Sequence, residues 1–99
     1  MNLDLMRELR VIDDCLARCL TEISKYPEEK LDFRRLSLRM PYSKRQVRTR
    51  LLRLIKCKLI EYDEDKSLRF TLIGGYFYWN LVKLSEEVEK LVETAQEND

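Results

Sequence analysis

The sequence predicts a mainly α-helical protein with one small β-hairpin, which is the α+β fold class. Near both ends of the chain, apolar residues recur at alternating spacings of four and three, the periodicity of amphipathic helices. Between them, two short apolar segments flank an acidic turn, a pattern typical of a hairpin. The 99 residues include only two glycines and two prolines, which leaves little room for linkers. We therefore expect a single domain spanning residues 1–99.

A long first helix is expected from about Leu3 to Tyr26. Its heptad-like stripe consists of Leu5, Leu9, Ile12, Leu16, Cys19, Ile23 and Tyr26. Further apolar positions widen this stripe, so we expect the helix to contact more than one neighbouring element. The helix should end at the polar break formed by Pro27, Glu28 and Glu29.

Two shorter helices joined by a tight turn should follow. The first, of about eight residues, must stop before Pro41, because the residue preceding a proline is pushed out of helical geometry. The second should begin at Lys44, because Ser43 and Gln46 have the spacing of a capping box. It should end near Lys58, and the residues at core spacing on it are Val47, Leu51 and Leu54.

The segment from Arg34 to Lys58 carries ten Lys or Arg residues and no Asp or Glu. The whole chain has 19 basic and 18 acidic residues, so the rest of it holds nine basic residues and all 18 acidic ones. The ten are Arg34, Arg35, Arg39, Lys44, Arg45, Arg48, Arg50, Arg53, Lys56 and Lys58. A concentrated positive surface attracts polyanions, so nucleic acid is the first candidate partner.

A hairpin and a last helix should complete the chain. The strands are expected at Leu59–Tyr62 and Leu68–Leu72, around the acidic turn between them, and the Gly74-Gly75 pair is expected to break the chain. The last helix, residues 76–96, carries a stripe of Phe77, Leu81, Leu84, Val88 and Leu91. At 1.5 Å per residue this helix is longer than a compact domain of this size can cover. We therefore expect it to be the dimerisation helix of a homodimer.

No enzyme chemistry is expected. The chain lacks His, and it shows no Gly-rich phosphate loop and no nucleophile elbow. Cys15, Cys19 and Cys57 do not make a zinc set; Cys15 and Cys19 are expected to be small core residues, with an intermolecular disulfide as the open alternative. We expect no cofactor, no metal and no small-molecule effector.

Membrane insertion and secretion are not expected either. No apolar run approaches the roughly 20 residues of a membrane span, and Met1 to Leu20 is too charged for a secretory signal. We expect a cytoplasmic, nucleoid-associated protein.

Two motifs resemble a known superfamily. The first motif lies around the third helix, the one expected to begin at Lys44, and consists of Ser43, Val47, Leu51, Leu54, Leu59 and Ile60. A capping Ser or Thr, a Val, two Leu and a Leu-Ile pair stand at these places in winged helix-turn-helix regulators of the ArsR, MarR and PadR type. Phe70-Thr71-Leu72-Ile73-Gly74 is similar to their junction between wing and last helix, with Phe in place of Leu. The resemblance covers Val11 to Leu84 and looks most like the small dimeric members found in archaea and their viruses.

The resemblance implies that a homodimer binds double-stranded DNA in a sequence-specific manner, as a transcriptional regulator, with the third helix in the major groove. Arg45 and Arg48 near the start of that helix have the chemistry to pair with guanine edges or phosphates. The expected DNA-binding residues are Arg34, Arg35, Arg39, Ser43, Lys44, Arg45, Arg48, Thr49, Arg53, Lys66 and Arg69. Lys58 stands where these families usually have Gly, at a position that favours left-handed geometry. The wing tip is acidic at Asp63, Glu64 and Asp65, where that of relatives is often basic.

Other interpretations stay open. One is a winged-helix module for protein contacts that uses its long terminal helices as docking surfaces, and another is an architectural DNA-binding protein without sequence preference. The aromatic run Tyr76–Trp79 has the chemistry for base stacking, but core or dimer packing is favoured because Phe77 belongs to the last stripe. Leu52 and Ile55 lie on the otherwise polar face of the third helix and are expected to pack under the first helix.

Overall fold

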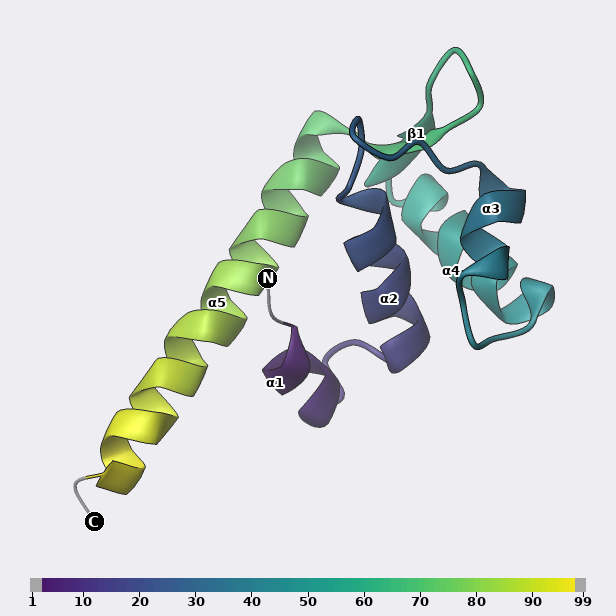
Figure 1. Cartoon of the computed structure of the whole chain (residues 1–99). Helices are drawn as coiled ribbons and strands as arrows, with labels where there is room; N and C mark the ends of the chain where they lie inside the picture. The colour runs from purple at the N-terminus through teal and green to yellow at the C-terminus, as the bar shows by residue number, and fades with distance from the viewer. Residues whose placement is uncertain (1–2, 98–99) are drawn as a thin grey trace.

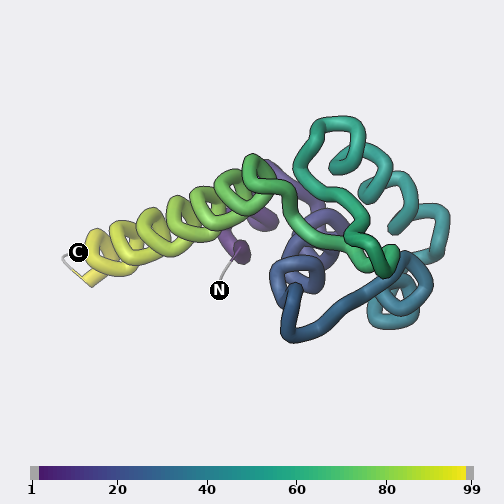
Figure 2. The backbone as a smooth tube through the Cα atoms, turned by 90° about the horizontal axis from the view of Figure 1, so that it is seen from above, coloured from purple at the N-terminus to yellow at the C-terminus, as the bar shows by residue number. Residues whose placement is uncertain are grey.

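The computed structural model describes residues 3–97, and this part of the chain is mainly helical with one two-stranded antiparallel hairpin (Figure 1). The elements are α1 (Asp4–Glu8), α2 (Asp14–Ile23), α3 (Phe33–Leu38), α4 (Lys44–Lys56), β1 (Ile60–Tyr62), β2 (Leu68–Phe70) and α5 (Leu72–Glu97). Helices α2, α3 and α4 gather with the hairpin, while α5 runs out of this group and past α1 (Figure 2). The molecule accordingly measures 52 × 27 × 24 Å. The predicted α+β class is confirmed.

The single first helix predicted from Leu3 to Tyr26 is wrong, because the chain breaks between α1 and α2. Arg10 adopts a left-handed φ of 59°, and the N–H groups of Arg10 and Val11 donate back into the last turn of α1 at 3.0 Å each. These two bonds satisfy carbonyls at the end of α1 and stop it. The Asp13 carboxylate then accepts the N–H of Leu16 at 2.6 Å and starts α2 as its N-cap.

The turn between α3 and α4 is built by capping. Helix α3 has six residues rather than the expected eight, because the N–H of Arg39 donates only three residues back, at 3.0 Å, and closes a tight last turn. It ends before Pro41, as predicted. The N–H of Gln46 donates to Ser43 Oγ at 3.2 Å, and the N–H of Ser43 donates to Gln46 Oε1 at 3.0 Å. The predicted capping box and the start of α4 at Lys44 are confirmed.

Helix α4 ends at a left-handed residue, as the position of Lys58 suggested. Lys58 has a φ of 64°, which costs a non-glycine residue roughly 1–2 kcal/mol. Its N–H donates to the Ile55 carbonyl at 3.0 Å, and the N–H of Leu59 donates to the Leu54 carbonyl at 2.9 Å. This Schellman arrangement offsets part of the cost and turns the chain into β1.

The core lies between α2 and α4. Val47, Leu51 and Leu54 are buried there, as their spacing predicted. The expected burial of Leu52 under the first helix is wrong: its side chain is 58% exposed, because α2 packs on the opposite side of α4. Ile55 is partly buried against the edge of the core.

The hairpin is confirmed, although β1 starts one residue later and β2 ends two residues earlier than predicted. Its register pairs Ile60 with Phe70 and Tyr62 with Leu68. Ile60 and Leu68 are buried, and the N–H of Leu68 donates to the carbonyl of Leu31 at 2.8 Å. This bond fixes the hairpin against the segment that leads into α3.

Helix α5 starts at Leu72 rather than Tyr76, so the Gly74-Gly75 pair lies inside the helix and is not the predicted break. Thr71 provides the start signal, because its hydroxyl accepts the N–H of Gly74 at 2.9 Å. Neither glycine has a positive φ, so both fit helical geometry. The extra residues join α5 directly to β2.

Gly74 is required by a close approach of two backbones. A Cβ at this position would lie 1.6 Å from the carbonyl oxygen of Leu59. That same carbonyl accepts the N–H of Thr71 at 3.1 Å, and the Thr71 hydroxyl donates to the carbonyl of Lys58 at 2.6 Å. The start of α5 is therefore held directly against the end of α4.

The face that α5 buries differs from the predicted stripe. Tyr78, Val82 and Ser85 are buried, and the Tyr78 ring stacks on Phe70 with 5.1 Å between centroids. Further along, the N–H of Leu5 in α1 donates to a carboxylate oxygen of Glu89 at 3.2 Å. The stripe of Phe77, Leu81, Leu84, Val88 and Leu91 is exposed or only half-buried. Leu81 packs against the core, but most of this apolar stripe of α5 stays in contact with water.

The glycine pair gives a matched test of this junction. Gly74→Ala should lower the free energy of unfolding by about 3 kcal/mol or more, because the new Cβ collides with backbone that cannot move cheaply. Gly75→Ala should be neutral or stabilise by about 0.5–1 kcal/mol, because its Cβ would meet only Phe70 at 4.0 Å. Urea unfolding followed by circular dichroism measures both. Equal effects of the two changes would contradict the close approach.

Candidate nucleic-acid interface

One side of α4 is free of the core. The outward face of α4 consists of Arg45, Arg48, Thr49, Leu52, Arg53 and Lys56, all of them exposed. It lies opposite the buried row of Val47, Leu51 and Leu54, because spacings of three and four residues return to the same side of a helix. The capping box fixes where this face starts. The result is a rigid, mostly cationic helical surface.

Most of the basic segment carries no ion pair among the described residues 3–97. Only Arg39 and Arg50 of the ten cations contact a carboxylate there; the other eight do not. These eight are Arg34, Arg35, Lys44, Arg45, Arg48, Arg53, Lys56 and Lys58. Their charges are not neutralised locally, so the positive potential extends from the outward face of α4 to α3.

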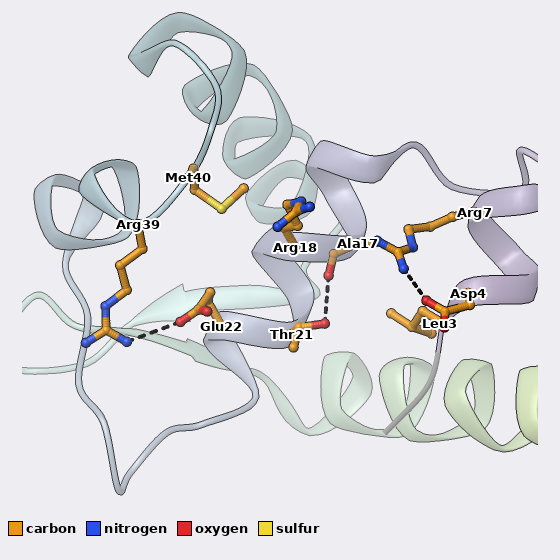
Figure 3. Close-up of a pocket in the computed structure, with 9 residues that line it drawn as sticks. All are labelled: Leu3, Asp4, Arg7, Ala17, Arg18, Thr21, Glu22, Arg39 and Met40. Carbon is orange, nitrogen blue, oxygen red and sulfur yellow. Dashed lines mark hydrogen bonds and ion pairs between the residues drawn. The ribbon is translucent and has the colours of Figure 1, made fainter.

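Arg39 faces away from the outward face of α4. Its guanidinium contacts Glu29 at 2.7 Å and Glu22 at 3.2 Å, and Figure 3 shows it turned toward Glu22 in a depression beside α2. The Arg39 guanidinium lowers the pKa of Glu29, and Glu29 in turn raises that of Arg39. A DNA contact by Arg39 would have to compete with this pairing.

Arg50 is held in a similar way at the other flank of α4. Its guanidinium contacts the carboxylate of Asp13 at 3.1 Å, and Asp13 is also the N-cap of α2. The hydrogen bond that the Arg50 guanidinium donates to the Asp13 carboxylate raises the pKa of Arg50. This pair links α2 to α4 and removes Arg50 from the uncompensated charge.

An aromatic ring supports Arg48. The guanidinium carbon lies 5.0 Å from the centroid of the Phe33 ring, within cation–π range. Phe33 and Arg34 line a surface depression together with Tyr62 and Lys66 of the hairpin. The fold therefore brings Arg34, Arg48 and Lys66, which lie far apart in the sequence, around one aromatic surface.

The remaining predicted side chains are partly committed within the protein. The Ser43 hydroxyl belongs to the capping box, and that of Thr49 donates to the carbonyl of Arg45 at 2.9 Å. Arg69 pairs with Glu61 across the hairpin at 3.1 Å. Arg34, Arg35, Lys44, Arg45, Arg48, Thr49, Arg53 and Lys66 are exposed.

The acidic hairpin turn has a structural task. The Asp63 carboxylate accepts the N–H groups of Asp65 at 2.8 Å and Ser67 at 2.9 Å, and the Tyr26 hydroxyl at 3.0 Å. These hydrogen bonds, that of Ser67 above all, lower the pKa of Asp63. Lys66 occupies the left-handed position of the turn, with a φ of 62°. The acid at the turn therefore shapes the loop that presents Lys66.

A charged network holds the turn before α4 against α2. The Tyr42 hydroxyl donates to the Asp14 carboxylate, which also pairs with Arg18 and Arg7 at 2.8 Å each. The Tyr42 hydrogen bond, with Arg18 second, lowers the pKa of Asp14 from 3.8 to about 2. Tyr42 and Asp14 are 28 residues apart, so no local sequence pattern announces this contact.

The cysteines behave as expected for Cys15 and Cys19, which are buried thiols in α2, while Cys57 is exposed after α4. Burial raises the pKa of the Cys19 thiol to about 12, so it stays protonated near neutral pH. Across residues 3–97, no cluster of three or more potential metal ligands is found.

Comparison with known proteins gives no family assignment. No protein-family model matches the chain, and no curated protein is significantly similar to it. In the part of the chain that the structure describes, no helix combines the length and apolar character that crossing a bilayer requires.

The Tyr42 contact predicts a pH-dependent loss of stability. Asp14 has a lowered pKa in the folded protein, so its contribution is present above pH 3.8 and is lost as the pH falls toward about 2. Tyr42→Phe should therefore lower the free energy of unfolding at pH 6, by a small amount because solvent screens the partly exposed contact. The difference from wild type should shrink as the pH approaches 2. Urea unfolding across this pH range measures it, and Tyr76→Phe, an exposed tyrosine, should show no such trend.

Proposed function

We propose that this protein binds double-stranded DNA as a homodimer of winged helix-turn-helix subunits and acts as a sequence-specific transcriptional regulator. The observation that carries the proposal is the outward face of α4, where four cations lie without an acidic partner among residues 3–97. An α-helix fits the major groove, and such a face meets phosphates on both walls and base edges between them.

The surroundings of α4 support the same interaction. Arg34 and Arg35 on α3 lie outside any ion pair of the described chain and are exposed to reach phosphates beside the groove. The Phe33 ring lies against the guanidinium group of Arg48 and restricts its position, which lowers the entropy cost of a base contact. Lys66 at the hairpin turn would serve as the wing contact.

A protein-docking module is the second candidate, because several large apolar side chains are exposed on α5. Eight cations on α3, α4 and the turn after α4 have no acidic partner within residues 3–97, and such a surface suits DNA better than a protein partner. A negative result in the DNA test below would favour this second function.

Salt-dependent binding to duplex DNA tests the proposal. If a dimer neutralises about 6–10 phosphates, the affinity should fall by roughly 10³–10⁵ between 50 and 200 mM salt. Fluorescence anisotropy with a labelled duplex selected from a random pool measures the slope. The absence of binding at 50 mM salt would refute the DNA-binding function.

Two arginines of α4 provide a matched pair for this test. Arg45→Gln should weaken the selected site and reduce the salt slope by about one per subunit, because it removes an uncompensated cation. Arg50→Gln removes the same charge from the same helix, but its partner is Asp13, so its effect on binding should be small. Equal losses would mean that only net charge matters.

The apolar stripe of α5 is the proposed dimer interface. Leu84 and Leu91 are exposed there, and α5 carries this stripe far beyond the group formed by α2, α3 and α4 (Figure 2). Soluble monomers rarely leave such a continuous apolar stripe in water. A two-fold dimer would bury it from both sides and set two α4 helices to read successive major grooves about 34 Å apart.

Placing charged residues in the apolar stripe of α5 tests this interface. Val88→Glu combined with Leu91→Glu should give a folded monomer with weak DNA binding, because two carboxylates would be buried in the dimer. Sedimentation at tens of micromolar measures the mass. Lys83→Glu with Lys90→Glu is the control on the opposite side of the helix and should remain dimeric. A monomeric wild-type protein would contradict the interface.

A further inference from the structure

Leu52 stands out on the outward face of α4. Its side chain is 58% exposed, although it sits among cations: Arg45 and Arg48 lie two turns and one turn before it, and Lys56 one turn after it. A single exposed leucine needs no special explanation elsewhere on a protein. Here it occupies the middle of the surface that would enter the major groove, where a further charged residue would strengthen phosphate binding.

Its neighbour Thr49 points to the same chemistry. The Thr49 hydroxyl donates to the Arg45 carbonyl at 2.9 Å, so its polar group is already bonded within the helix. Its γ-methyl group is the part without such a bond. Leu52 and the methyl group of Thr49, three residues apart on one side of α4, therefore form a small apolar spot between cationic side chains.

The major groove contains one apolar group that such a spot can recognise. Thymine alone among the four bases carries a C5 methyl group in this groove, and apolar side chains contact it. Burying this methyl against leucine removes apolar surface from water, whereas leucine against a phosphate or a polar base edge gains nothing.

We propose that Leu52, with the methyl group of Thr49, reads the C5 methyl of a thymine in each half of the DNA site. This inference rests on the proposed DNA binding by α4. The surrounding arginines then supply affinity and guanine contacts, and Leu52 supplies discrimination for thymine at one base pair.

Replacing thymine by uracil tests the contact, because it removes the methyl group and leaves every hydrogen-bonding atom in place. In a duplex selected from a random pool, each thymine is replaced singly, and binding is measured by fluorescence anisotropy at fixed salt. At one position in each half-site, uracil should weaken wild-type binding by about fourfold, the value of roughly one buried methyl group.

The Leu52→Ala variant should lose most of the fourfold preference for thymine over uracil, because the larger of the two apolar contacts is removed while the methyl group of Thr49 stays. Leu38→Ala is the matched control, because Leu38 is an exposed leucine of the same basic segment, on α3 rather than α4, and this variant should keep the fourfold preference. Circular dichroism checks that both variants fold as wild type does.

The outcomes separate this inference from the DNA-binding function. Tight binding of the selected duplex without any uracil-sensitive position, or a fourfold preference that persists undiminished in Leu52→Ala, would overturn the role of Leu52 and leave DNA binding standing. Failure to bind any duplex would overturn both.

Discussion

The contact between the Leu59 carbonyl and the backbone of α5 at Gly74 is the constraint on which the arrangement of elements depends. It joins the end of α4 to the start of α5 without any intervening side chain. The Thr71 hydroxyl and N–H add hydrogen bonds to Lys58 and Leu59, so the same few atoms terminate one helix and cap the next. The direction in which α5 leaves the core relative to α4 is therefore fixed by backbone geometry, which tolerates less variation than side-chain packing.

Ion pairing divides the basic segment into neutralised flanks and a positively charged face. Arg39 and Arg50 lie on the flanks of the α3–α4 unit, and each contacts carboxylates from the acidic remainder of the chain. Exposed pairs of this kind contribute little to stability, typically below about 1 kcal/mol each. Their larger consequence is electrostatic, because they neutralise the sides that face α2 and leave the outward face of α4 positive. The positive charge of the basic segment is therefore concentrated on one side of the folded protein, the outward face of α4.

Local signals predicted the fold well where a side chain acts on its own backbone. Ser43 and Gln46 located the start of α4, whereas the left-handed geometry at Lys58 followed only from the resemblance to families that usually have Gly at this position. The sequence does not predict the break in the first helix, because the heptad spacing continues through it. In the structure Leu9, a member of that stripe, is 61% exposed. The Gly74-Gly75 pair wrongly predicts a break, because nothing nearby in the sequence shows that the Leu59 carbonyl approaches Gly74. Likewise, the partners that neutralise cations of the candidate site come from distant segments that spacing cannot identify.

Helix α5 carries two neighbouring stripes, of which only one faces the core. Tyr78, Val82 and Ser85 form the buried face, and the predicted stripe through Phe77 and Leu81 runs one residue ahead of it. One residue is a rotation of about 100° on a helix, so the stripes lie on adjacent sides and cannot both face the same core. The stripe of Tyr78, Val82 and Ser85 packs within the chain, against Phe70 and α1. The other stripe is covered only in part among residues 3–97, because Leu81 packs against the core while Leu84 and Leu91 are exposed. A helix with this geometry can belong to its own fold and to an interface at the same time.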